Sequence, residues 1–112
     1  MDNRINAWLE DILTCIDEIN EFLPEEKDFF IYQTDLKTKK AVERNIEIIG
    51  EAVNRIVKSE NAPFQITNAK NIIGTRNRII HEYDSISDEI IWTIILRELP
   101  KLKLEILERI KH

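Results

Sequence analysis

Residues 34–59 read TDLKTKKAVERNIEIIGEAVNRIVKS, and this stretch decides the fold. Its apolar residues recur every three or four positions, which places them on one face of an α-helix. That stripe consists of Val42, Ile46, Ile49, Val53, Ile56 and Val57. We therefore predict a long amphipathic helix from Thr34 or Asp35 to about Ser59. Pro63 follows shortly afterwards and cannot continue a helical hydrogen-bond ladder.

The same spacing recurs on both sides of this stretch. It predicts a helix over about residues 3–22, one from residue 68 to about 83–84, one beginning after Ser85 or Ser87, and a last one beyond Pro100, which should break or kink the chain. No strand-like alternation competes with these helices. The expected fold is all-α, an antiparallel bundle of four or five helices in a single domain over residues 1–112. Because one bundle core of this size is modest, a homodimer is also expected.

Composition narrows the cellular setting. The single cysteine, Cys15, cannot form an internal disulfide and suits a core position. No signal segment and no apolar run of about 20 residues is present, so we expect a cytoplasmic protein without a membrane partner. The net charge is −5, which opposes nucleic-acid binding because affinity for phosphates comes mainly from Lys and Arg. RNA contact would have to be local, brief or assisted.

The chemistry lies in residues 74–83, GTRNRIIHEY. At about 100° per residue, Arg76 falls at the centre of an apolar helix face, with Tyr83 beside it. A guanidinium aimed into such a face is costly to bury alone. We expect it either to pair internally with a carboxylate, Glu47 or Glu51, or to line a cleft at an interface between two chains.

His81 supplies the other reactive group of this stretch, with Asn77 one turn before it on the same side of the helix. A histidine can act as a base near neutral pH, and an arginine can hold phosphate oxygens through two hydrogen bonds. Together they suit RNA cleavage by the 2′-hydroxyl without a metal or another cofactor. On an ideal helix, however, Arg76 and His81 are about 140° apart. A cleft shared by two protomers would solve that problem.

Residues 76–83 resemble the R-x4-H-x-Y motif of HEPN-domain ribonucleases, and most of all the motif of the HepT toxin branch. Residues 43–52, ERNIEIIGEA, are similar to the second helix of that branch. The tail from Ile91-Trp92 to Leu102 is also similar, so the resemblance extends from about residue 3 to residue 110. One departure is Glu82, which would place a carboxylate where RNA approaches, where it would either tune His81 or repel substrate.

The resemblance implies a HEPN-like dimer whose two motifs meet at a cleft. Arg76 and His81 would be catalytic, and Asn77 would be a polar support. Tyr83 matches the tyrosine that a minimal nucleotidyltransferase antitoxin of the MntA kind modifies with AMP. That modification would add charge and bulk beside the phosphate site and silence an endoribonuclease toxin.

Other interpretations stay open. Arg76 could be purely structural, Asn77 and His81 could be surface residues, and Tyr83 could simply pack at a rim. The chain would then be a non-catalytic helical module that binds a nucleotidyltransferase or a nucleotide. The basic stretch 37–44 fits a solvent-exposed helix face, and a patch that guides RNA is the more specific alternative. Trp8 and Trp92 fit core or dimer-seam positions better than base-stacking positions.

Overall fold

A computed structural model describes residues 3–23, 26–59, 65–81 and 87–110. Every regular element in these ranges is helical, which confirms the all-α class. The elements are α1 Asn3–Phe22, α2 Phe29–Thr34, α3 Leu36–Lys58, α4 Ala69–His81, α5 Asp88–Thr93, the π-helix η1 Ile94–Glu98 and α6 Leu99–Ile110. None of the helices in the described ranges is both long and apolar enough to cross a membrane.

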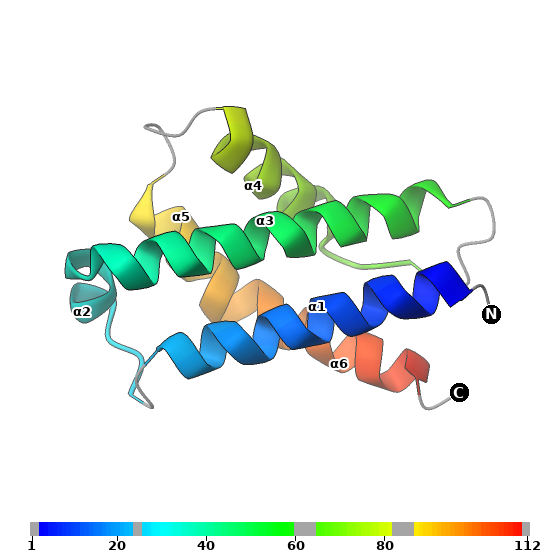
Figure 1. Ribbon diagram of the computed structural model, residues 1–112, viewed down its shortest axis with the longest axis horizontal. Coiled ribbons are helices and arrows are strands. Elements are labelled where there is room, and N and C mark those ends of the chain that lie inside the picture. Colours follow the sequence, from blue (N-terminus) through cyan, green and yellow to red (C-terminus); the bar gives the residue numbers. More distant parts are fainter. Residues whose placement is uncertain (1–2, 24–25, 60–64, 82–86, 111–112) are drawn as a thin grey trace.

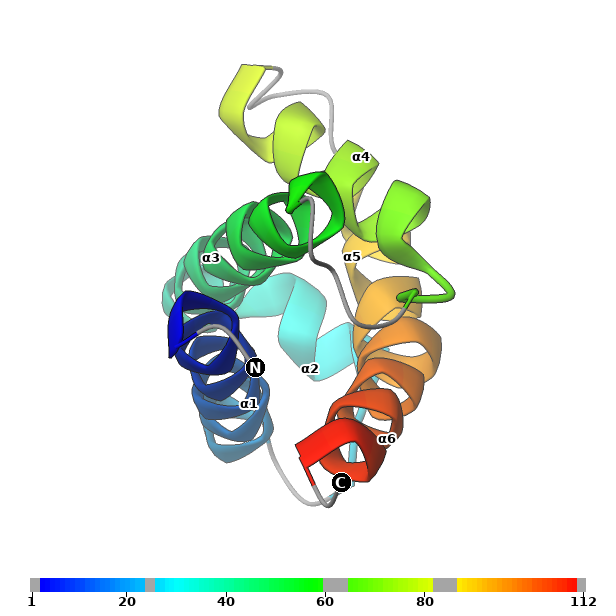
Figure 2. The same cartoon turned by 90° about the vertical axis from the view of Figure 1, so that its right-hand side faces the viewer.

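Helix α3 is the centre of the bundle. It lies between α1, which runs antiparallel to it, and α4, while α5, η1 and α6 cross behind (Figure 1). The end-on view shows α6 closing the bundle below α4 and beside α1 (Figure 2). The two predicted stripes meet in a core that excludes water, with fully buried Ile5, Leu9, Ile12, Ile19, Val42, Ile46, Ile49, Val53 and Ile56. Val57, which the pattern placed on the stripe, is 41% exposed instead.

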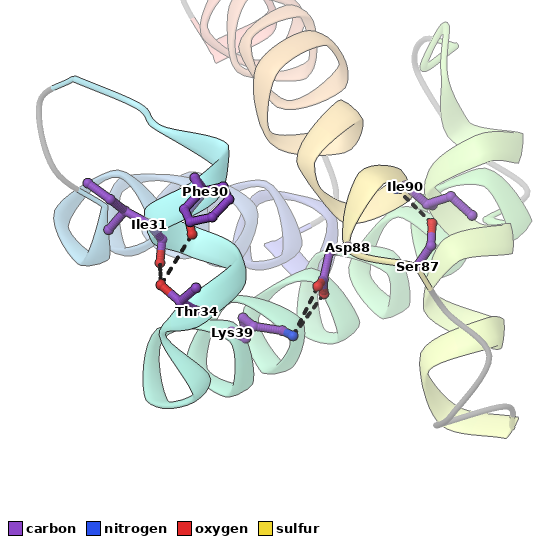
Figure 3. Close-up of polar contacts among 7 residues, drawn as sticks. All are labelled: Phe30, Ile31, Thr34, Lys39, Ser87, Asp88 and Ile90. Carbon is purple, nitrogen blue, oxygen red and sulfur yellow. Dashed lines mark hydrogen bonds and ion pairs between the residues drawn. The ribbon is translucent and has the colours of Figure 1, made fainter.

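Helix α2 was not predicted, because a single turn and a half is too short to show a period. It begins at Asp28, whose carboxylate accepts hydrogen bonds from the backbone N–H groups of Phe30 and Ile31. The Thr34 hydroxyl ends it by donating to the carbonyls of Phe30 and Ile31 (Figure 3). Asp35 is both the C-cap of α2 and the N-cap of α3, so a single residue turns the chain from one helix into the next.

Of the two outcomes predicted for Pro100, a break or a kink in the last helix, the break is wrong. The chain widens into η1 just before Pro100, and the Leu99 N–H bonds to the Ile94 carbonyl, five residues back. A π-turn at this point relieves the clash between the proline ring and the preceding turn. The helix therefore runs from α5 through η1 into α6 without a stop.

An ion pair joins the starts of α3 and α5. Lys39 Nζ lies 3.0 and 3.1 Å from the two carboxylate oxygens of Asp88, and both side chains are about one-fifth exposed. The neighbouring Ser87 hydroxyl caps α5 by accepting from the Ile90 N–H (Figure 3). The ion pair therefore holds the start of α5, which follows residues 82–86 in the chain, against α3.

Candidate functional site

Arg76 crosses α3 at Gly50. A Cβ added to Gly50 would lie 2.3 Å from the Arg76 Cβ and 2.8 Å from its Cγ, distances that real atoms do not adopt. Gly50 itself is buried in the middle of α3. The absence of a side chain there lets α4 approach and lets the arginine stem pass across the helix. An isolated glycine inside an otherwise continuous helical pattern was the sequence signal for this crossing.

The guanidinium of Arg76 is held from two sides. Its Nη2 lies 2.6 Å from Glu51 Oε2, and its Nη1 donates a 3.1 Å hydrogen bond to Asn77 Oδ1. Glu51 also binds Arg55, whose Nε donates to Glu51 Oε1 at 2.9 Å. Internal pairing with Glu51, one of the two predicted alternatives, is thus confirmed. The apolar face around Arg76 packs on α3 of the same chain, where Ile72 is fully buried and Ile73, Ile79 and Ile80 remain partly exposed.

This guanidinium lies in a pocket of about 310 Å³ between α1 and α3. Trp8 and Asp11 line it from α1, and a stripe of α3 that includes Arg44 and Arg55 forms its long wall. Arg44 pairs with Glu47 at 3.1 Å. The lining therefore balances three arginines against three carboxylates, and each of these arginines contacts a carboxylate in the resting protein.

His81 is placed differently. It is the last residue of α4, it is exposed, and it is not among the residues that line the Arg76 pocket. Asn77 is also exposed, and it contacts Arg76 rather than a core group. Among the pockets that the described residues form, none is lined by both Arg76 and His81, as the helix geometry led us to expect. Tyr83 and Glu82 lie outside the described residues.

Other reactive groups belong to the core. Cys15 is buried, and desolvation, assisted by the carboxylates of Glu18 and Asp11, raises the pKa of its thiol to about 11. The thiol is thus neutral near pH 7, which suits the predicted role as core filler. Asn45, the buried polar residue on α3, donates to the Cys15 carbonyl and to Glu18 Oε1. The described residues contain no cluster of three or more His, Cys, Asp or Glu that could hold a metal ion.

Comparison with known proteins gives a consistent result. The family described as Ribonuclease HepT-like matches residues 12–110. A relative from Methanocaldococcus jannaschii, named "Putative RNase MJ0127", is 36% identical over 107 residues, which cover 96% of this chain and 88% of the relative. "Probable ribonuclease HepT" from Thermococcus cleftensis is 32% identical over 96 residues, 86% of each chain. No solved structure matches the chain.

The fold and the site thus define an all-α bundle that holds an arginine of an R-x4-H-x-Y motif against its central helix. The family match covers most of the chain and includes that motif. The protein belongs to the HepT-like ribonuclease family.

Proposed function

We propose that the protein is an endoribonuclease that cleaves RNA by attack of a 2′-hydroxyl, without a metal. The observation that carries this proposal is the Arg76 guanidinium, positioned by Gly50 and Glu51 and open to a pocket, within a chain of a ribonuclease family. A fixed cation of this kind suits the negative charge that develops on phosphate oxygens in the transition state.

The proposed reaction divides the work between two side chains. His81 takes the proton of the 2′-hydroxyl, and the 2′-oxygen forms a bond to the adjacent phosphorus. Arg76 binds the non-bridging oxygens of that phosphate. The bond from phosphorus to the 5′-oxygen breaks, that oxygen takes up a proton, and a 2′,3′-cyclic phosphate remains. Asn77 supports Arg76 through its hydrogen bond to Nη1.

A homodimer would bring together the two side chains, Arg76 and His81, that share no pocket among the described residues of one chain. His81 is exposed at the end of α4 and outside the Arg76 pocket of its own chain. A cleft between two copies can bring His81 of one chain to the Arg76 pocket of the other. We therefore propose that the active unit is a dimer. Mixing chains with Arg76→Ala and chains with His81→Ala would then restore part of the cleavage that each variant lacks alone.

Growth on induced expression tests the nuclease proposal. Wild type should arrest growth of a host cell, and His81→Ala and Arg76→Ala should not. Arg97→Gln, which removes an exposed arginine from η1, is the charge-matched control and should arrest growth like wild type. Arrest by His81→Ala at the wild-type level would contradict the proposal.

The product ends test the mechanism separately. Purified wild type should release RNA fragments with 2′,3′-cyclic phosphate ends, identified by mass spectrometry, in the presence of EDTA. An RNA with 2′-O-methyl groups should resist cleavage because its nucleophile is blocked. Fragments with 3′-hydroxyl ends, or complete loss of activity in EDTA, would contradict 2′-hydroxyl attack without a metal.

Regulation by a partner is the second part of the proposal. We propose that a nucleotidyltransferase antitoxin transfers AMP to Tyr83: the phenol oxygen bonds to the α-phosphorus of ATP, and pyrophosphate leaves. The added phosphate would repel RNA beside the catalytic arginine. Co-expression with such a partner should add the mass of one adenylyl group, AMP less one water, to the chain. Persistence of that mass in Tyr83→Phe would move the site elsewhere.

A non-catalytic partner module is the second candidate. The Arg76–Glu51 ion pair gives the arginine a structural role, and the net charge of −5 disfavours RNA. This candidate predicts that the chain binds a nucleotidyltransferase or a nucleotide, that wild type and His81→Ala leave growth equally unaffected, and that neither cleaves RNA.

A further inference from the structure

The pocket beside Arg76 continues along α3 as a charged groove. Arg44 and Arg55 stand at its two ends, separated by three turns of helix or about 16 Å. The Arg76 guanidinium reaches Glu51 between them. Three guanidinium groups therefore belong to the lining of one groove.

The outer two arginines are available to a ligand. Arg44 is 66% exposed and Arg55 is 56% exposed, and each pairs with a carboxylate of its own helix. Surface ion pairs of this kind are worth at most about 1 kcal/mol. A phosphate with two acceptor oxygens can therefore replace the carboxylate at each guanidinium. In the absence of a ligand, the carboxylates keep the groove neutral.

Trp8 provides a flat wall for the same groove. Its side chain packs against the hydrophobic core and is also one of the residues that line the pocket. It is held by α1 and is only half-buried. An aromatic face next to arginines is the arrangement by which proteins bind single-stranded nucleic acid, since any base can stack on it.

We propose that this groove is a subsite for single-stranded RNA flanking the bond that is cut. One base stacks on Trp8, and Arg44 and Arg55 bind backbone phosphates on either side of the phosphate held by Arg76. The inference rests on the proposed ribonuclease function, because Arg76 is the group that brings the scissile phosphate to this place. It assigns Trp8 a surface function in addition to the core position expected from the sequence.

Tryptophan fluorescence tests the stacking. The probe is a single-stranded hexaribonucleotide with 2′-O-methyl groups, which can bind but cannot be cut by 2′-hydroxyl attack. It should quench the fluorescence of wild type and of Trp92→Phe. Trp8→Phe should lose the quenching, and Trp8→Ala should bind the labelled probe at least about fivefold more weakly. Quenching that survives in Trp8→Phe, or no quenching of wild type, would overturn the proposal.

The salt dependence of binding tests the arginines without relying on a tryptophan variant. Arg44→Gln and Arg55→Gln should each reduce the slope of log affinity against log salt by about 0.7, the value for one lost phosphate contact on a single strand. Lys101→Gln, an exposed control on α6, should leave the slope unchanged. An equal change in all three variants would reveal general charge attraction and contradict a built subsite.

Two further outcomes separate this inference from the proposed function. If wild type arrests growth through His81 but the probe does not quench the fluorescence of Trp8, the proposed RNA subsite is wrong and the proposed nuclease function is supported. If the probe binds through Trp8 and Arg44 but no RNA is cut, the proposed nuclease function is wrong and RNA binding by the groove is supported. If Trp8→Ala and Arg44→Gln change the oligomeric state, measured by light scattering, without weakening binding of the probe, these residues serve the contact between chains and the proposal is overturned.

Discussion

The two ends of the R-x4-H segment are held by the fold in opposite ways. Arg76 passes over Gly50, pairs with Glu51 and is 24% exposed, so its position is determined by α3 of the same chain. His81 ends α4 and is exposed to solvent. The bundle thus fixes the guanidinium and leaves the imidazole exposed, and in the dimer that we propose a neighbouring chain would position it. Substitution of Arg76 should therefore lower both stability and activity, whereas substitution of His81 should lower activity alone.

Gly50→Ala should have the largest effect, because the new Cβ would overlap the Arg76 Cβ and force α3 and α4 apart. We expect the free energy of unfolding to fall by about 1–3 kcal/mol, as in other overpacked interfaces. RNA cleavage should fall with it, because Arg76 moves. Urea unfolding followed by circular dichroism gives the stability.

Gly74→Ala is the matched control for that variant. Gly74 also lies in a helix, but nothing lies within 4 Å of a Cβ built there. Alanine should raise the free energy of unfolding by about 0.5–1 kcal/mol, since it loses less backbone entropy than glycine. Equal destabilisation by the two alanine variants would show that the Gly50 crossing is not the tight point of the fold.

Glu51→Gln should have the next effect, because one carboxylate holds both Arg76 and Arg55. The side chain is 36% exposed, so solvent weakens both pairs, and we expect a loss of about 1 kcal/mol. Cleavage should fall because Arg76 is no longer oriented. Glu47→Gln, which loses a pair with the exposed Arg44, should change the stability by less than about 0.5 kcal/mol.

Sequence alone predicted the parts of this arrangement that depend on local pattern. The bounds of α1 agree with the structure, and α3 begins one residue after Asp35, the later of its two predicted starts, because long stripes are local signals. Helix α2 was too short for a period, and the effect of Pro100 depended on a π-turn that no pattern reveals. Glu51 was a predicted partner for Arg76. The isolated Gly50 signalled a close approach, but the sequence could not predict that Arg76 crosses there, because that depends on how α3 and α4 approach each other.

Lys39→Met extends the comparison to the start of α5, the helix that follows residues 82–86 in the chain. It removes the ion pair that joins the start of α5 to α3, and leaves the carboxylate of Asp88 partly buried. We expect a loss of about 0.5–1 kcal/mol, measured by thermal unfolding. Lys103→Met breaks the more exposed pair with Asp17 and should have a smaller effect. If both variants lose the same stability, the partial burial of the Lys39 pair has no energetic consequence.

His81→Ala should have the smallest effect on stability and a complete effect on cleavage. An exposed residue at the end of a helix contributes within about ±0.5 kcal/mol, and alanine is a good helix former. Arg76→Ala should differ by losing stability together with activity, because it removes the pair with Glu51 and the stem that packs over Gly50. Measuring both variants by unfolding and by RNA cleavage decides the comparison. A large loss of stability in His81→Ala would mean that the fold itself holds the imidazole, which would contradict the proposed need for a second chain.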